Sequence, residues 1–523
     1  MSTTCGPRNA FLTLPAEMID RILCGLDLRS LLKCKEVCKK LKTHIETGKE
    51  IQYIMELEIA GCVHNDHNTW SSAQRLDCLR KHQAAWEQLK WSKGREVRML
   101  GGTLWELYGG ILAQTDMEGT FHFLKLPSEI RHIEEDSWTI KPNIDNIRDF
   151  GIDPSQNLLV WVTAPSPTSP SISLHLRTLR TTENHPLARQ PVIHYEPHRP
   201  MGRWHFAIRI MQDYIGLQAY RRSSPDEEDI TDLTDFLVWN WKENKRELAV
   251  QTDHTQSFSF VSDRHVVLAN HFVGQTLEIT EPYLVLIDFK AEEETKKLVT
   301  EARHSMKLCY PDLASEVVVL QFGISCEPAP GWTPGEDDKT PFFISKDNRI
   351  FMVTMRIQQR GNDYAFEHFI PLSAFKKCID HLDTSSGQQL KWSEWAPTDT
   401  RLIRSSLPAS DVWVCFAYGS RSVGGEFRRR GNVIFGVVVY DFNQLLFRRN
   451  VTTSKDSSNT RIEKPGPIIQ TDEIWTEPVK TSLPYSRYFG ELPVRPGGYS
   501  IMCTADNLVL VDIKAQQFRI YKF

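Results

Sequence analysis

The sequence has no long apolar run. Its longest candidate, residues 433–440, is about the length of one buried strand and far shorter than the roughly 18 residues that a membrane helix needs. Residues 1–10 also lack the basic start followed by an apolar core that marks a secretory signal. We therefore expect no membrane partner, and we expect the protein to stay inside the cell, in the cytoplasm, the nucleus or both.

An excess of charge of either sign is missing too. The 62 Lys and Arg residues nearly balance 66 Asp and Glu residues, which gives a net charge of -4. This balance provides no general attraction for nucleic acid, so we expect no nucleic-acid partner. The chain has 523 residues and is 41% hydrophobic, which suits a folded protein of several domains or one large repeat domain with an appendage.

The sequence shows no regular cysteine framework. Its eleven cysteines are odd in number and irregular in spacing, which favours reduced thiols over disulfides. One stretch collects five possible zinc ligands, namely Cys62, His64, His67, Cys78 and His82. Their spacing matches no known zinc finger, so we predict no metal site and no cofactor, and we interpret these residues as surface polar groups.

Recognisable catalytic motifs are also absent from the sequence. No P-loop, glycine-rich dinucleotide motif, nucleophile elbow, zinc-protease motif or C-x-x-C pair occurs. We therefore predict a protein without catalytic residues.

What the sequence does contain begins with a helical pattern near the N-terminus. Pro15 suits the start of a first helix, Asp27 can cap a second, and Gly48 can end a third. Apolar residues recur within these segments at helical spacing, at Met18, Ile22 and Leu26, then at Leu28, Leu31 and Leu32, then at Val37, Leu41 and Ile45. Three helices this short bury too little surface to be stable alone, so we expect them to pack on a partner or on the rest of the chain.

Residues 8–48 resemble an F-box, the helical motif that docks onto a Skp-type adaptor in cullin-based ubiquitin ligases. The resemblance is carried in register by Leu14, Pro15, Glu17, Met18, Ile22, Leu23, Leu26, Ser30, Leu31, Leu32, Val37, Cys38 and Lys39. It implies adaptor contacts by Leu14, Pro15, Met18, Ile22, Leu23, Leu26, Leu31, Leu32, Val37 and Cys38. Met18 stands where isoleucine is more usual, and Leu41 where an aromatic often follows the basic pair. The alternative is an ordinary helical hairpin with apolar core positions.

Residues 49–93 continue the helical pattern, although Glu58 interrupts its apolar stripe. We interpret them as a helical linker that fixes the F-box relative to the rest of the chain. This stretch, together with residues near 468–485, also resembles the long F-box proteins of mushroom-forming fungi.

From residue 94 onward the apolar period changes from 3.6 to 2, which indicates strands. Seven groups of strands recur, at 104–126, 150–179, 204–241, 258–289, 316–372, 412–447 and 499–523. Repeated groups of this kind are typical of a β-propeller, because each small sheet needs its neighbours to cover its faces. We therefore predict an α+β multidomain protein in which residues 94–523 form a seven-bladed β-propeller. We expect this propeller to bind a protein that the ligase modifies, which we call the target. A pair of β-sandwiches, or two separate β-domains, is the alternative.

One compact basic cluster stands out in the β-region. It comprises Arg421, Arg428, Arg429 and Arg430. A solvated loop is the ordinary interpretation of such a cluster. Guanidinium groups also suit an acidic or phosphorylated segment, so these arginines are our first candidates for contact with a protein target.

Together these features predict a substrate receptor of a Skp-cullin-F-box ubiquitin ligase. The F-box would hold the adaptor and, through it, a cullin, and the β-domain would hold an unknown protein target. The alternative is a scaffold whose F-box binds the adaptor without a cullin, and a propeller enzyme is a third interpretation that the missing motifs disfavour.

Overall fold

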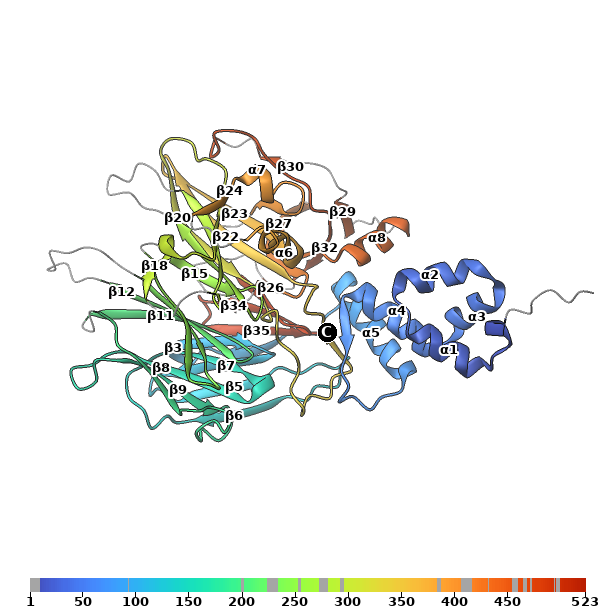
Figure 1. Ribbon diagram of the computed structural model, residues 1–523, viewed down its shortest axis with the longest axis horizontal. Coiled ribbons are helices and arrows are strands. Elements are labelled where there is room, and N and C mark those ends of the chain that lie inside the picture. The colour runs from blue at the N-terminus through green and yellow to red at the C-terminus, as the bar shows by residue number, and fades with distance from the viewer. Residues whose placement is uncertain are drawn as a thin grey trace, which may run out of the picture.

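The structure is a computed structural model. It describes residues 10–92, 94–198, 202–222, 234–252, 255–271, 281–291, 296–382, 387–405, 416–430, 432–453, 460–463, 468–470, 473–492, 494 and 499–523. Helices α1–α5 project from one side of a large β-domain as an arm, and the C-terminus lies at the base of this arm (Figure 1).

Three helices follow the 3-10 turn Ala10–Thr13 and match the predicted N-terminal pattern. They are α1 (Ala16–Cys24), α2 (Leu28–Val37) and α3 (Lys39–Thr47). Asp27 caps α2, because its carboxylate accepts a hydrogen bond from the Ser30 amide at 2.7 Å, and Gly48 ends α3, as predicted. The buried residues of the three helices and of α4 form one small core, which contains Ile19, Leu23, Leu28, Leu31, Leu41, Ile45, Ile51 and Met55.

The predicted helical linker contains α4 (Lys49–Ala60) and α5 (Ser72–Gln88), and also a short strand, β1 (Cys62–His64), that we did not predict. Ser71 and Gln74 form a capping box that starts α5. Glu58, the polar residue in the apolar stripe of α4, has a structural role: its carboxylate accepts a hydrogen bond from the Leu28 amide at 2.9 Å. This bond ties the linker to the start of α2, where a negative charge is favourable.

The β-domain consists of seven sheets of four or five strands, which we number as blades in chain order. Blade 1 contains β3 (Gly101–Tyr108), β4 (Ile111–Asp116), β5 (Phe121–Lys125) and β6 (Asp136–Ile140). Blade 2 contains β7 (Ile147–Asp153), β8 (Leu158–Thr163), β9 (Ile172–Thr178) and β10 (Val192–Tyr195). Blade 3 contains β11 (Arg203–Met211), β12 (Tyr214–Arg222), β13 (Thr234–Asn240), β14 (Lys245–Thr252) and β18 (Lys297–Leu298).

The remaining four blades follow the same plan. Blade 4 contains β15 (Thr255–Phe260), β16 (His265–His271), β17 (Pro282–Asp288), β19 (Ser305–Cys309) and β24 (Gln388–Leu390). Blade 5 contains β20 (Val317–Ser325), β22 (Ile350–Gln359), β23 (Asn362–Pro371) and β25 (Arg401–Arg404). Blade 6 contains β26 (Ala417–Tyr418), β27 (Arg421–Arg430), β28 (Asn432–Asp441), β32 (Tyr485–Glu491) and β29 (Thr460–Glu463). Blade 7 contains β2 (Arg95–Arg98), β33 (Ser500–Cys503), β34 (Asn507–Asp512) and β35 (Gln517–Lys522).

The seven sheets form a single ring. The first strands of blades 1 to 5 contact one another in sequence, β22 of blade 5 contacts β26 of blade 6, and β33 of blade 7 contacts β26 and β27. Blades 1 and 7 close the ring through a shared core that includes Leu107 and Val509. The chain is therefore a seven-bladed propeller preceded by an F-box-like arm, as predicted, and the alternatives of paired sandwiches or separate β-domains are wrong.

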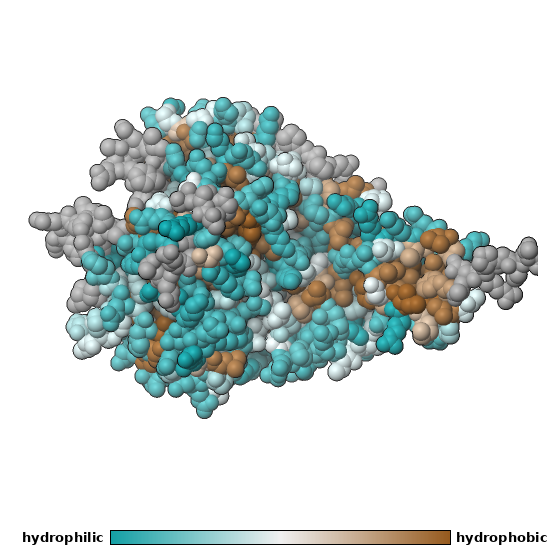
Figure 2. Space-filling model, in the orientation of Figure 1, coloured by the Kyte–Doolittle hydropathy of each residue, from teal (hydrophilic) through white to brown (hydrophobic). Residues whose placement is uncertain are grey.

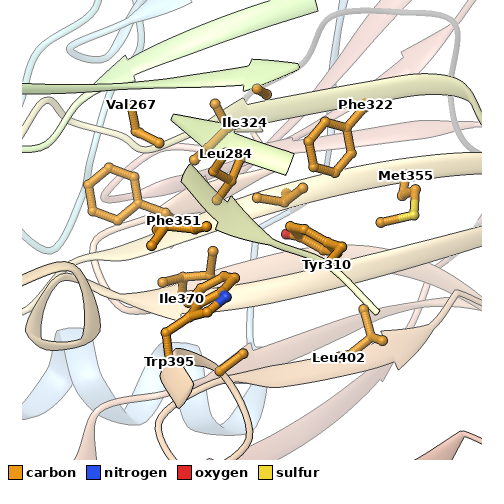
Figure 3. Close-up of a cluster of buried hydrophobic side chains, with 14 of the residues drawn as sticks. Val267, Leu284, Tyr310, Phe322, Ile324, Phe351, Met355, Ile370, Trp395 and Leu402 are labelled. Carbon is orange, nitrogen blue, oxygen red and sulfur yellow. The ribbon is translucent and has the colours of Figure 1, made fainter. Parts of the chain in front are cut away.

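Apolar side chains that face each other between neighbouring blades hold the ring together. The largest cluster joins blades 4 and 5, where Leu284 and Phe322 lie with Ile370 and Trp395 (Figure 3). Within this cluster the Tyr310 hydroxyl and His368 Nδ1 are 2.6 Å apart, and burial lowers the pKa of His368 to about 3. The ring of His368 is therefore neutral at physiological pH, as a buried core position requires.

Three parts of the predicted strand pattern are wrong. Within the predicted group 316–372 the apolar pattern predicts one strand over residues 341–357, but β21 (Phe342–Ile344) leaves blade 5 and pairs with β1 of the linker. Residues 444–447 are helical, because Asn443 caps α8 (Gln444–Thr452) through the amides of Leu445 and Leu446. The β-domain also holds elements absent from our prediction. They are α6 (Leu372–Ile379), α7 (Trp392–Trp395), the 3-10 turns Pro154–Gln156 and Val299–Glu301, the pair β30 (Ile468–Gln470) and β31 (Val479–Thr481), and the blade strands β2, β6, β10, β14, β18, β19, β24, β25, β29 and β32.

Candidate protein-binding site

The arm carries an exposed apolar surface on α1 and α2. Four large apolar side chains are far from buried there, namely Met18 (49% exposed), Ile22 (43%), Leu32 (48%) and Val37 (69%). Met18 and Ile22 are one helical turn apart and share a face of α1. Apolar side chains gather over this end of the molecule (Figure 2). Exposed clusters of this kind usually mark protein-binding surfaces.

The other predicted adaptor contacts divide between the surface and the core. Pro15 is exposed just before α1, and three further side chains, Leu14, Leu26 and Cys38, are half-buried. Leu23 and Leu31 are 1% and 0% exposed, because they point into the core of the arm. For these two residues direct contact with an adaptor does not fit the structure, and their role is to hold α1 and α2 behind the exposed surface.

Two of the four predicted target-binding arginines are engaged within the protein. Arg421 Nε lies 3.0 Å from Asp441 Oδ2, and its guanidinium group lies over the ring of Trp86. Arg428 Nε lies 2.9 Å from Glu426 Oε1, and its guanidinium group stacks 3.6 Å from the centre of the Phe489 ring. These contacts give both arginines a structural role. Their contact with a target remains a prediction. The side chains of Arg429 and Arg430, on β27, lie outside the described residues.

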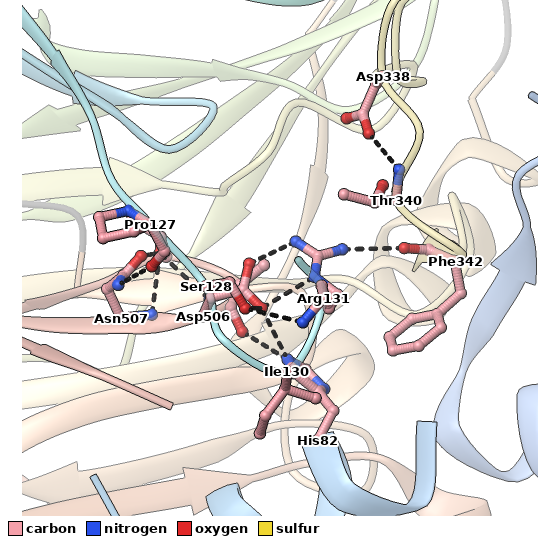
Figure 4. Close-up of polar contacts among 12 residues, drawn as sticks. His82, Pro127, Ser128, Ile130, Arg131, Asp338, Thr340, Phe342, Asp506 and Asn507 are labelled. Carbon is pink, nitrogen blue, oxygen red and sulfur yellow. Dashed lines mark hydrogen bonds and ion pairs between the residues drawn. The ribbon is translucent and has the colours of Figure 1, made fainter. Parts of the chain in front are cut away.

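A polar cluster joins the arm to the propeller (Figure 4). Arg131 pairs with Asp506 through two hydrogen bonds, of 2.8 Å from Nε and 2.5 Å from Nη2. His82 Nε2 lies 2.8 Å from the Ala505 carbonyl oxygen and 3.4 Å from Asp506 Oδ1. Trp86 Nε1 donates to the same Ala505 carbonyl at 3.0 Å. The end of α5 is therefore fixed on the turn between β33 and β34.

The charges in this cluster are well defined. Burial alone would raise the pKa of Asp506, but the charge of Arg131 and the hydrogen bonds from His82 and Arg131 outweigh it and hold that pKa well below its usual range. Burial lowers the pKa of His82 by more than Asp506 raises it. His82 is therefore neutral, with its proton on Nε2, the nitrogen that faces two acceptors.

The five residues considered as zinc ligands are not surface polar groups as a set. His82 and Cys78 are 7% and 4% exposed, so our interpretation is wrong for both. Cys78 Sγ donates to the Ile130 carbonyl oxygen, and His64 Nε2 lies 2.6 Å from Arg75 Nη1. Burial raises the pKa of Cys62 to about 11 and that of Cys78 to about 12, so both remain thiols. Among the described residues, no group of three His, Cys, Asp or Glu side chains could hold a metal ion.

Sequence comparison identifies a known domain in the N-terminal part of the arm. Residues 11–50 match the model of the F-box domain. The protein therefore consists of an F-box domain at residues 11–50 followed by a seven-bladed β-propeller-like domain. The resemblance to fungal F-box proteins is not shown by these comparisons and stays a prediction. A search of curated proteins finds no match.

Solved structures resemble the chain only distantly. The WD40 domain of SCAP from fission yeast has a TM-score of 0.31 at 9% identity and covers 83% of this chain and 97% of its own. The tricorn protease matches with a TM-score of 0.32 at 10% identity, and the match covers 75% of this chain and 36% of the protease chain. Extracellular domains 1–2 of Drosophila Semaphorin 1a match with a TM-score of 0.32 at 10% identity, and the match covers 82% of this chain and 88% of the semaphorin chain. The architecture described above rests on the strand pairing and not on these similarities.

The substitution Asp506→Asn is expected to lower the free energy of unfolding by about 3 kcal/mol, because it leaves the buried charge of Arg131 without its partner. The pKa of Asp506 is lower in the folded state than its ordinary value, so this stabilisation is present at neutral pH and is lost only as the pH falls below that ordinary value. Urea unfolding at pH 7 measures it. The control Asp136→Asn breaks an exposed pair with Arg180 and should cost less than about 1 kcal/mol. Equal losses for the two variants would contradict the prediction.

Proposed function

We propose that the protein is a substrate receptor of a Skp-cullin-F-box ubiquitin ligase. The observation that carries this proposal is the exposed apolar surface of Met18, Ile22, Leu32 and Val37 within a segment that matches the F-box domain. F-box domains bind Skp-type adaptors, and these side chains offer the apolar area that such an interface needs. The propeller would bind a protein target, and a cullin would join through the adaptor.

The protein itself would perform no chemistry. F-box proteins are typically non-catalytic subunits, and we propose the same role here, in which the receptor holds a target close to the ubiquitin-transferring subunits. We propose that it acts in the cytoplasm, the nucleus or both. Among the described residues, no helix is long and apolar enough to cross a membrane.

A scaffold that binds the adaptor without a cullin is the second candidate, since the same apolar surface would serve it. Affinity purification of the full chain from cells separates the two. Adaptor and cullin together support the ligase, adaptor alone supports the scaffold, and neither protein would overturn both. Proximity labelling with and without proteasome inhibition would then identify the target.

A chain that starts at Lys49 is expected to keep the fold of its propeller and its target, to lose the adaptor, and to raise the cellular level of the target. Starting at Gly94 instead would remove Trp86, whose ring lies 4.3 Å from that of Phe523, and would uncover apolar surface of the propeller. Circular dichroism checks the fold, and target abundance by quantitative mass spectrometry checks the effect. A folded Lys49 chain that captures nothing the full chain captures would favour the scaffold.

A further inference from the structure

One connection in the propeller is much longer than its counterparts. The first and second strands of six blades are joined by two to four residues, for example 109–110 in blade 1 and 504–506 in blade 7. In blade 5 the same connection, between β20 and β22, spans residues 326–349. We call this segment the strap.

The strap lies against the turns of three other blades. The Ala329 amide lies 3.5 Å from the Tyr108 hydroxyl in blade 1. A Cβ atom at Gly335 would lie 2.5 Å from the Ser155 carbonyl oxygen in blade 2, and one at Gly331 would lie 2.9 Å from the Gln212 side chain in blade 3. Backbone contact this close excludes larger residues at Gly335, so the strap is fitted to the propeller surface.

The strap also holds the linker along its length. Its strand β21 pairs antiparallel with β1, with Val63 opposite Phe343. Beyond that pairing, three linker side chains donate to strap carbonyl oxygens: Asn65 to Asp338 at 2.9 Å, Asn68 to Lys339 at 2.7 Å, and Tyr53 to Pro341 at 3.0 Å. Backbone carbonyls are thus satisfied across the joint by side chains of the arm.

Phe342 is the apolar centre of this contact. It is 1% exposed and packs in a core made by α4 and α5, with Tyr53, Leu57, Ala60, Leu76, Cys78 and Leu79. Its carbonyl oxygen accepts a hydrogen bond from Arg131 Nη1 at 2.9 Å, so it also joins the cluster around Asp506 (Figure 4). A residue of blade 5 therefore contributes to the interior of the linker.

We propose that the strap is a clasp that fixes the direction of the F-box relative to the propeller, with Phe342 as its anchor. Blades 1, 6 and 7 already contact the arm, through the Ile130 carbonyl oxygen that accepts from Cys78, the ion pair of Arg449 with Glu56 at 2.8 Å, and Ala505. The strap adds an attachment from blade 5, and attachment to four blades restrains rotation of the arm. A rigid receptor keeps its target at a high effective concentration near the ubiquitin-transferring subunits. This consequence for ubiquitin transfer rests on the proposed function. The clasp itself does not depend on that function.

The experiment measures the distance between a fluorophore pair on the full chain, without adaptor or target. The labels replace Lys42 on α3 and Lys514 in the turn between β34 and β35, both of which are exposed. They are introduced as bio-orthogonal amino acids, because the eleven cysteines prevent selective thiol labelling. We expect one narrow distance distribution for the unchanged chain and an approximately twofold broader one for Phe342→Ala.

The matched control is Phe343→Ala, the same change at the next position of β21, where the side chain is only half-buried. It should leave the distribution narrow. Should Phe342→Ala fail to fold, the double variant Tyr53→Phe and Asn68→Ala removes two strap hydrogen bonds without opening the core, and it should also broaden the distribution. A distribution that stays narrow in a folded variant of either kind overturns the clasp.

Ubiquitin transfer is then measured separately on the same variants. A broader distribution together with slower transfer, at unchanged adaptor binding, supports both proposals. A broader distance distribution in a protein that purifies without a cullin supports the clasp and contradicts the ligase function. Failure of the clasp and failure of the ligase function are therefore distinguishable.

Discussion

The double substitution Ile22→Asp and Leu32→Asp is expected to abolish binding of a Skp-type adaptor while the protein stays folded. Both side chains are more than 40% exposed, so aspartate at either position can be hydrated in the free protein. In a complex these carboxylates would be buried against apolar surface without a partner. With about 2 kcal/mol lost at each position, the affinity should fall roughly 1000-fold.

Calorimetric titration with the purified adaptor measures this loss, and thermal unfolding tests whether the fold persists. The matched control is Met117→Asp with Ile513→Asp, which places the same charges on exposed apolar residues of the propeller (83% and 46% exposed). The control should bind as the unchanged chain does. If the Ile22 and Leu32 variant keeps its affinity, the apolar surface is not the adaptor site.

Substituting Leu31 would be a weaker test of the same surface. Its side chain is fully buried, so truncation to alanine opens a cavity that typically costs about 2–5 kcal/mol of stability, and lost binding could then follow from lost structure. Leu31 and Leu32 are neighbours in an apolar pattern that predicts helices correctly. Which of the two faces outward depends on how α1, α3 and α4 pack around α2, and this packing is not encoded in local spacing.

The propeller was predictable because its blades repeat. Each of the seven predicted strand groups contains strands of a different blade, and fully buried strands such as β8 and β13 have clear apolar sequences. Outer strands were harder to recognise. For example, β10 has only four residues, and β6 is mostly exposed or half-buried. Short edge strands carry little periodicity, so their assignment depends on the neighbour with which they pair.

The junction between arm and propeller could not be predicted from the sequence. His82 and Asp506 are separated by more than 400 positions, and nothing near either one indicates the other. We interpreted His82 as a surface polar group, and no motif in the sequence distinguishes Asp506 from other aspartates. Phe342 belonged to a plausible strand of blade 5, yet its side chain lies between two linker helices. Polar and aromatic residues of this kind acquire their roles only once distant segments meet.

Deleting residues 517–523 is expected to unfold the propeller at physiological temperature. The strand β35 is paired on one side with β34 and on the other with β2, so it joins the two ends of the β-domain in blade 7. Its removal takes away four buried side chains, namely Phe518, Ile520, Tyr521 and Phe523. At about 2 kcal/mol each the loss is roughly 8 kcal/mol, comparable to the whole stability of many domains.

The deletion should also expose the edges of β34 and β2, which invites association between chains because their backbone groups lose their partners. Thermal unfolding and sedimentation measure the two effects, and Ile513→Ala with Lys514→Ala in the adjoining exposed turn provides the control that should change neither. A shortened chain that melts at the temperature of the full chain and remains monomeric would mean that the ring does not depend on this strand. The closure of blade 7 by the first and last strands of the domain predicts the opposite, since every other blade relies on a closed ring to cover both of its faces.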